Sequence, residues 1–328
     1  MRSNGPDGSR LLALLRLDRL RASPDASNTI AALDRLLLLL PDRHRLIDGT
    51  GLDLYRDFDT LLIATPNPRD AAVTFLAARH HLMDAALRAA LDRGAKTAKN
   101  PITWRTVEGR PVGIRQPERG PANQGLDRDD RILVLPMPAL ALMATPPYAT
   151  LLLGRDLLAP TTSTGAVDAG SPDAQPGGGE RRKPAGRPNW REIAARIEAE
   201  ESAVPDNAAF LMTMTGLFGT PAVDSEVGPP PQSLTVVAGA EAPFIEILAE
   251  FKTAAEADRW EQDVPAWKRK LVTNPVVILS GFSSLIGRAE NTREGNTLHL
   301  RLELSTAELQ RLLNLAGNLA QTALAHPR

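Results

Sequence analysis

A strand–turn–strand–helix pattern occurs twice in this chain and constrains the fold more than any other feature. The first copy runs from Thr60 to Arg93, and the second begins at Ser233. In each copy two short apolar runs flank a turn-forming stretch, and a helical pattern follows. The two copies predict two related domains, each with an antiparallel sheet packed by helices.

A hairpin follows the helix in both copies. In the first half, residues 102–107 and 110–116 are strand-like, and the Glu108-Gly109 pair between them is a two-residue hairpin signal. The second half has its counterpart in residues 287–292 and 297–304. Strands, helix and hairpin in this sequence predict an α+β fold with ferredoxin-like, or split βαβ, order. Sheet and helices would then form two layers around one core in each unit.

The composition changes sharply between residues 159 and 188. This stretch is rich in Pro, Gly, Ser and Thr, and it cannot bury enough apolar surface to offset the entropy lost on ordering. We therefore predict a first α+β unit at 1–158, a flexible linker at 159–188 and a second α+β unit at 189–328. A chain of 328 residues is long enough for two such domains.

One apolar stretch, Ile132 to Gly154, is long enough to cross a bilayer and carries no charge. It contains four prolines, however, and each interior proline costs a helix about 3 kcal/mol. We therefore predict buried strands at 132–135 and 139–144 and no transmembrane span. The N-terminus lacks the apolar segment of a signal peptide. This indicates a cytoplasmic location if Met1 is the true start, and a periplasmic or envelope location if an upstream segment is missing.

Composition also argues against several classes of function. The chain has no cysteine, which excludes disulfides, thiolate zinc sites and thiol nucleophiles. A net charge of −1 and an aromatic content of 4% argue against a nucleic-acid partner. An RNA-binding ferredoxin-like sheet would need stacking aromatics, and Tyr55, Phe75 and Trp104 are too few and unsuitably placed. A protein partner is the expectation that remains.

Two groups of residues could carry chemistry. Asp53, Asp57 and Asp59 form an acidic loop, and His80 and His81 follow the second strand of the first copy. The acidic spacing does not match a calcium loop, so we interpret these residues as caps and turn residues. Adjacent histidines on a strand point to opposite faces, and we interpret the pair as a solvated strand end. The alternative is a metal-dependent hydrolase that uses the three aspartates with His80 or His81.

Other patterns are interpreted structurally. Trp260 and Trp267 are seven residues apart and predict a core-facing helical stripe, which Pro265 interrupts. Ser305 with Glu308 predicts a capping box at the start of the last helix. The polar run from Asp127 to Asp130 and the basic run from Arg181 to Lys183 are interpreted as solvated, and Met212 and Met214 as packing residues. No serine nucleophile elbow, P-loop or dinucleotide-binding glycine pattern is present.

Two segments carry a resemblance. Asp59-Thr60-Leu61-Leu62-Ile63-Ala64 enters the first unit, and Glu294-Gly295-Asn296-Thr297-Leu298 closes the second. With the duplicated order they resemble uncharacterised bacterial proteins, often envelope-associated, that are built from two related α+β units. The resemblance implies a non-enzymatic role without cofactors, and an upstream signal or membrane segment in some relatives. We therefore predict a non-enzymatic binding or scaffolding protein with no catalytic, cofactor or metal residues.

Overall fold

The computed structural model describes residues 9–37, 47, 49–67, 74–107, 109–115, 132–144, 190–216, 229–279 and 281–325. The strands of the first half are β1 (Leu11–Arg16), β2 (Phe58–Thr65), β3 (Phe75–His80), β4 (Ile102–Val107), β5 (Arg110–Arg115), β6 (Ile132–Met137) and β7 (Leu140–Ala144). Those of the second half are β8 (Phe210–Thr215), β9 (Ser233–Gly239), β10 (Phe244–Glu250), β11 (Glu290–Glu294) and β12 (Thr297–Glu303).

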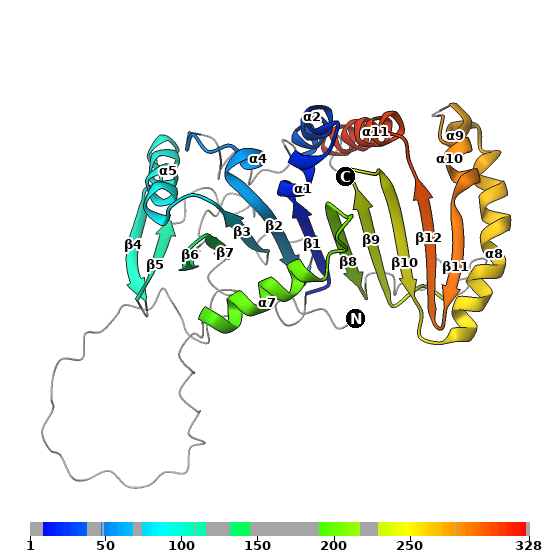
Figure 1. Cartoon of the computed structure of the whole chain (residues 1–328), viewed down its shortest axis with the longest axis horizontal. Coiled ribbons are helices and arrows are strands. Elements are labelled where there is room, and N and C mark those ends of the chain that lie inside the picture. Colours follow the sequence, from blue (N-terminus) through cyan, green and yellow to red (C-terminus); the bar gives the residue numbers. More distant parts are fainter. Residues whose placement is uncertain are drawn as a thin grey trace, which may run out of the picture.

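All of these strands belong to one antiparallel sheet (Figure 1). Its order is β11-β12-β10-β9-β8-β1-β2-β3-β7-β6-β5-β4. The halves meet at β1, where Leu14 is paired with Leu62 of β2 on one side and Leu211 of β8 on the other. This pairing satisfies the backbone groups on both edges of β1, which an isolated first half would leave open on one side.

The expected α+β class is therefore present, but the two halves share one sheet. In the second half β12 lies between β10 and β11, as in a split βαβ unit. In the first half the β6–β7 hairpin lies between β3 and β5. Because the halves differ in this way, the structure confirms neither duplicated domains nor ferredoxin-like order.

The helices lie on both faces and at both ends of the sheet. Those of the first half are α1 (Leu17–Ala22), α2 (Ala26–Leu37), α4 (Leu54–Asp57) and α5 (Asp84–Thr97). Those of the second half are α7 (Trp190–Ser202), α8 (Ala254–Val272), α9 (Pro275–Leu279), α10 (Ser283–Arg288) and α11 (Thr306–Ala325).

The central strands of the first half, β1, β2, β3, β6 and β7, are covered on both faces, which explains why their sequences are nearly continuous apolar runs. On one face α7 lies across the sheet (Figure 1), and its Ala194 and Ile197 join a core that contains Leu14. On the other face Leu17 of α1 and Leu87 of α5 belong to a second core.

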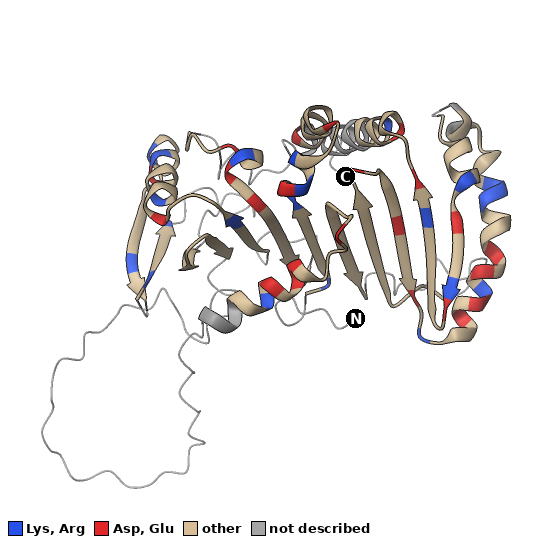
Figure 2. Cartoon of the chain, in the orientation of Figure 1, with Lys and Arg blue, Asp and Glu red and all other residues tan. Residues whose placement is uncertain are grey.

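The second half keeps one polar sheet face. The cross-strand register places Thr213, Thr235, Glu246 and Arg301 on the same face as Leu12 and Leu14. On the side seen in Figures 1 and 2, no described helix lies over β9, β10 and β12. Polar residues alternate here with Val237 and Phe244, which are buried in the core that also contains Leu14 and Ile197.

Several element predictions are confirmed. Residues 132–137 and 140–144 form β6 and β7, and within the described ranges no helix is long and apolar enough to cross a membrane. Ser305 and Glu308 form the reciprocal hydrogen bonds of a capping box. The runs Asp127–Asp130 and Arg181–Lys183 and the segment 159–188 lie outside the described residues.

Other predictions about α8 need correction. The helix continues through Pro265, which does not interrupt it. Trp260 packs on Trp267 with ring centroids 4.5 Å apart, and Trp260 joins the core formed by Phe251 and Leu298, as expected for a core-facing stripe. Leu271, four residues after Trp267, is 46% exposed, so the packed stripe ends before it.

Candidate functional site

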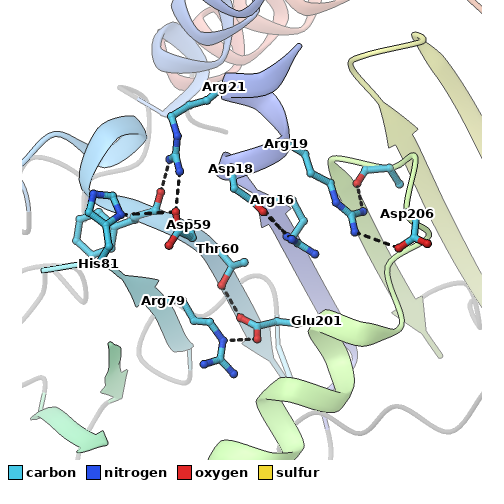
Figure 3. Close-up of polar contacts among 12 residues, drawn as sticks. Arg16, Asp18, Arg19, Arg21, Asp59, Thr60, Arg79, His81, Glu201 and Asp206 are labelled. Carbon is cyan, nitrogen blue, oxygen red and sulfur yellow. Dashed lines mark hydrogen bonds and ion pairs between the residues drawn. The ribbon is translucent and has the colours of Figure 1, made fainter. Parts of the chain in front are cut away.

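Charged side chains gather where the C-terminal end of α7 approaches β1, β2 and β3 (Figure 3). They line a pocket of about 630 Å³. Its lining consists of Arg16, Asp18, Arg19, Asp59, Thr60, Arg79, Glu198, Glu201, Ser202, Val204 and Asp206.

Glu201 attaches α7 to the sheet. One of its carboxylate oxygens accepts a hydrogen bond from Thr60 Oγ1 at 2.5 Å, and the other accepts one from Arg79 Nε. Thr60 and Arg79 are cross-strand partners on β2 and β3, so they face α7 together. The Glu201 side chain is only 11% exposed and that of Arg79 26%, which makes this ion pair well shielded from water.

A second pair lies at the junction of β1 and α1. Arg16 donates from Nε and NH2 to the two carboxylate oxygens of Asp18, at 3.0 and 2.6 Å. Partial burial works against ionisation of Asp18, but the hydrogen bonds and charge of Arg16, together with Arg19, outweigh it and lower the pKa of this carboxyl below its ordinary value. Asp18 is therefore an ionised partner of an arginine and not a proton donor.

Arg19 attaches the loop between α7 and β8. Its NH1 group donates to the carbonyl oxygens of Pro205 and Ala208, and NH2 lies 3.6 Å from the Asp206 carboxylate. Like Glu201, this arginine joins a segment of the second half to the first half.

The structure brings two of the predicted site residues together. Nδ1 of His81 lies 3.6 Å from Oδ1 of Asp59. The same oxygen accepts a hydrogen bond from Arg21 NH2 at 2.6 Å. Asp59 is thus engaged by an arginine. Among the described residues, no further carboxylate or imidazole joins Asp59 and His81 to complete a metal site.

The other two aspartates are structural, as the interpretation of the acidic loop predicts. Asp53 is the N-cap of α4, where its side chain accepts from the backbone N–H groups of Tyr55 and Arg56. Asp57 accepts from the backbone N–H of Asp53 at 2.8 Å. The hydrogen bond from Arg56 lowers the pKa of Asp57.

His80 is not at a solvated strand end, so that part of the interpretation is wrong. It is 1% exposed, its Nδ1 lies 3.1 Å from the carbonyl oxygen of Leu82, and its ring meets Phe58 edge-on. Burial lowers the pKa of His80, because a charged imidazole is poorly solvated there. His81, by contrast, has a half-exposed side chain, so the two imidazoles do not converge.

The alternative functions lose support from this geometry. Across the described ranges no group of three or more His, Asp or Glu side chains is arranged to hold a metal ion. Tyr55 and Phe75 are buried, and Trp104 lies under the guanidinium of Arg88, so the three aromatics form no platform for bases.

Apart from Asp59, sequence reasoning missed the residues that line the pocket. Arg79 and Glu201 are separated by 122 positions, and Arg19 and Ala208 by 189. No local pattern connects such residues, because charged positions on a helix or strand end usually indicate only a solvated face. The one available signal was Arg16 followed by Asp18 at a strand end.

Comparisons with known proteins do not place the chain in a family. Neither the protein-family models nor the curated protein sequences match it. The structure is similar to that of TP0453 in crystal form I, with a TM-score of 0.42, 9% identity, and coverage of 95% of this chain and 94% of the other. For crystal form IV the TM-score is 0.41 at 7% identity, with coverage of 94% and 93%. These likenesses are weak, and no function follows from them.

Proposed function

We propose that this chain is a non-enzymatic binding or scaffolding protein. The observation that carries the proposal is the pairing of the charged groups around the pocket. Four arginines engage four carboxylates there: Arg16 with Asp18, Arg19 with Asp206, Arg21 with Asp59 and Arg79 with Glu201. Acid–base catalysis needs a group whose pKa lies near the working pH and whose proton can reach a substrate. Arginine-bound carboxylates are poorly suited to that role and well suited to holding elements together.

The sheet supports the same conclusion. It offers the polar face of β9, β10 and β12, where Thr235, Glu246 and Arg301 lie, and an outer edge at β4 that pairs with no further described strand. Proteins commonly bind partners through such sheet surfaces, with the backbone of an edge strand providing hydrogen bonds. The division into units 1–158 and 189–328 and a location in the bacterial envelope are further parts of this proposal.

Site-specific crosslinking in the producing cell tests the proposal. A photo-crosslinking residue replaces Thr235 on the polar face or Thr103 on the β4 edge, and Arg259 on the outer side of α8 is the matched control position. Thr235 or Thr103 should give a discrete adduct with one protein, and Arg259 should not. Adducts of equal yield at all three positions would contradict a defined binding surface.

A second measurement addresses catalysis. The purified chain is incubated with a model ester or phosphoester and with Mg²⁺, Mn²⁺ or Zn²⁺. We expect no turnover. Hydrolysis that is lost in both Asp59→Asn and His81→Gln would overturn the proposal, because these are the two predicted site residues that the structure brings together.

A further inference from the structure

The two ends of the sheet differ in chemistry. At one end β11 carries Glu290, Arg293 and Glu294, and Arg293 is tied to Glu261 of α8 at 2.8 Å. Charged side chains on an edge strand discourage pairing with another chain. At the other end β4 reads Ile-Thr-Trp-Arg-Thr-Val, which is rich in β-branched and aromatic residues and has no proline. Only the β4 end has the composition of a strand that accepts a further partner.

The hairpin register shows which backbone groups of β4 point outward. Val107 and Arg110 flank a two-residue turn, so they form a hydrogen-bonded pair, and such pairs alternate along the hairpin. Thr106 is then in a non-hydrogen-bonded pair with Pro111, which agrees with the missing N–H of proline. The N–H and C=O groups of Trp104 and Thr106 therefore face away from β5, along the free edge of the described sheet.

Cationic side chains flank this edge on both faces. On one face the guanidinium of Arg88 lies over the Trp104 ring at 4.6 Å, while Asp92 accepts a hydrogen bond from Trp104 Nε1. Arg88 Nε is buried and makes no hydrogen bond with any described residue. On the other face Arg105 is exposed. Asp92, whose carboxylate contacts Trp104, is engaged by that hydrogen bond. Arg88 and Arg105 therefore place a positive charge on each face of this edge.

We propose that the β4 edge binds an extended acidic segment of a partner protein, which adds to the sheet as a further strand beside α5. This inference rests on the proposed binding function and assigns it a surface and a class of partner. The outward groups of Trp104 and Thr106 supply the backbone hydrogen bonds. Carboxylates of the added strand pair with Arg88 on one face and Arg105 on the other. Addition of a strand next to a flanking helix is a recurrent mode of peptide recognition.

A synthetic peptide of about eight residues tests the proposal, since strands of this length are common. The peptide carries glutamates at adjacent positions among valines and threonines, so that their carboxylates point to both faces of the added strand. Its counterpart carries lysine in place of each glutamate. The readouts are the dissociation constant by titration and amide hydrogen exchange measured residue by residue. The glutamate peptide should bind and slow the exchange of the Trp104 and Thr106 amides, and the lysine peptide should not.

Two variants and one matched control locate the binding. Thr106→Pro removes an outward N–H but leaves the β4–β5 hydrogen bonds intact, so it should weaken binding about tenfold. Arg105→Glu should weaken binding of the glutamate peptide by a similar factor and allow the lysine peptide to bind. Asn291→Pro is at an outward position of β11, equivalent to that of Trp104 in β4, because Glu294 and Thr297 flank the turn. It should leave binding unchanged.

Several results would overturn the proposal. The first is that the glutamate peptide does not bind, or binds equally well to Thr106→Pro. The second is that the peptide slows amide exchange on β11 or on the polar face. The third is that the Trp104 amide is protected without peptide, to a degree that depends only on protein concentration. The last would show that a second copy occupies the edge. If the edge fails these tests while Thr235 still forms its crosslink, the proposed binding function stands. If the crosslinks are absent as well, both fail.

Discussion

At the scale of single residues, Glu201 and His80 show how burial changes the behaviour of an ionisable group. Glu201 is shielded from water but has two partners, so its charge is compensated. His80 is shielded more completely, and its Nε2 atom makes no hydrogen bond with the described residues. The first group is stable as an ion, and the second is stable only when neutral.

Glu201→Gln should lower the free energy of unfolding by about 1–3 kcal/mol, because the Arg79 guanidinium then loses its counterion in a shielded position. Urea unfolding of the purified chain measures this. The control is Asp258→Asn, whose contact with Arg293 is more exposed and should matter by less than about 0.5 kcal/mol. Equal effects of the two substitutions would show that Glu201 does not fasten α7.

His80 predicts a pH dependence with a defined sign. Its pKa in the folded chain is below the ordinary value of 6.5, chiefly because of burial, although the nearby Asp84 acts in the opposite direction. Below pH 6.5 the unfolded chain therefore binds a proton that the folded chain does not. Stability is full above this pH and falls as the pH is lowered towards the folded pKa.

His80→Leu should remove this contribution, which is at most about 1.4 kcal/mol per pH unit. The measurement is urea unfolding at several pH values on either side of 6.5. His81→Gln, which alters a half-exposed imidazole, should keep the wild-type slope. A variant at His80 with an unchanged slope would assign the acid sensitivity to another group.

At the scale of elements, α8 shows how a helix tolerates an unfavourable residue. Pro265 removes one backbone donor inside the helix. A capping box at the N-terminus of α8 offsets this loss. In it Thr253 Oγ1 accepts a hydrogen bond from the N–H of Glu256, and the Glu256 carboxylate accepts one from the N–H of Thr253. Burial of Ala257 and Val264 against the sheet adds the larger share of stability.

Thr253→Ala should therefore cost about 1 kcal/mol, which is typical for loss of an N-cap. Thermal unfolding followed by circular dichroism checks the value. Thr273→Ala at the other end of α8 is the control, because its hydroxyl bonds only to carbonyl groups of the last turn. It should shift the midpoint much less, and a similar shift at both ends would contradict the capping argument.

At the scale of the whole molecule, one core runs through both halves. Leu14 of β1, Leu211 of β8, Ile197 of α7 and Phe244 of β10 belong to the same buried cluster. The β1–β8 ladder and the pocket ion pairs add further connections between the halves. Residues that share a core and a sheet should unfold together.

Cleavage within the predicted linker 159–188 should accordingly leave the two pieces associated. An inserted protease site there, followed by size-exclusion chromatography, tests this expectation, and the cleaved chain should elute as one species. Leu211→Asp places a charge in the β8 contact with Leu14 and should allow the pieces to separate after cleavage. Separation of the unsubstituted pieces would mean that the shared sheet contributes little to the association of the two halves.

Local patterns in the sequence determined the elements themselves. The β4–β5 hairpin, the Ser305 capping box, the Asp53 cap and the strands β6 and β7 follow from residues that are neighbours in the chain, because turns, caps and periodicity act over a few positions. Only the tertiary structure decided the strand order, the meeting of the halves at β1, the burial of His80 and the approach of Glu201 to Arg79. These contacts join residues that are far apart in the sequence. The local apolar pattern does not distinguish the strands that pair with β1 from other apolar strands of the chain. Their selection depends on how the whole sheet buries its apolar faces, a property that no short segment carries.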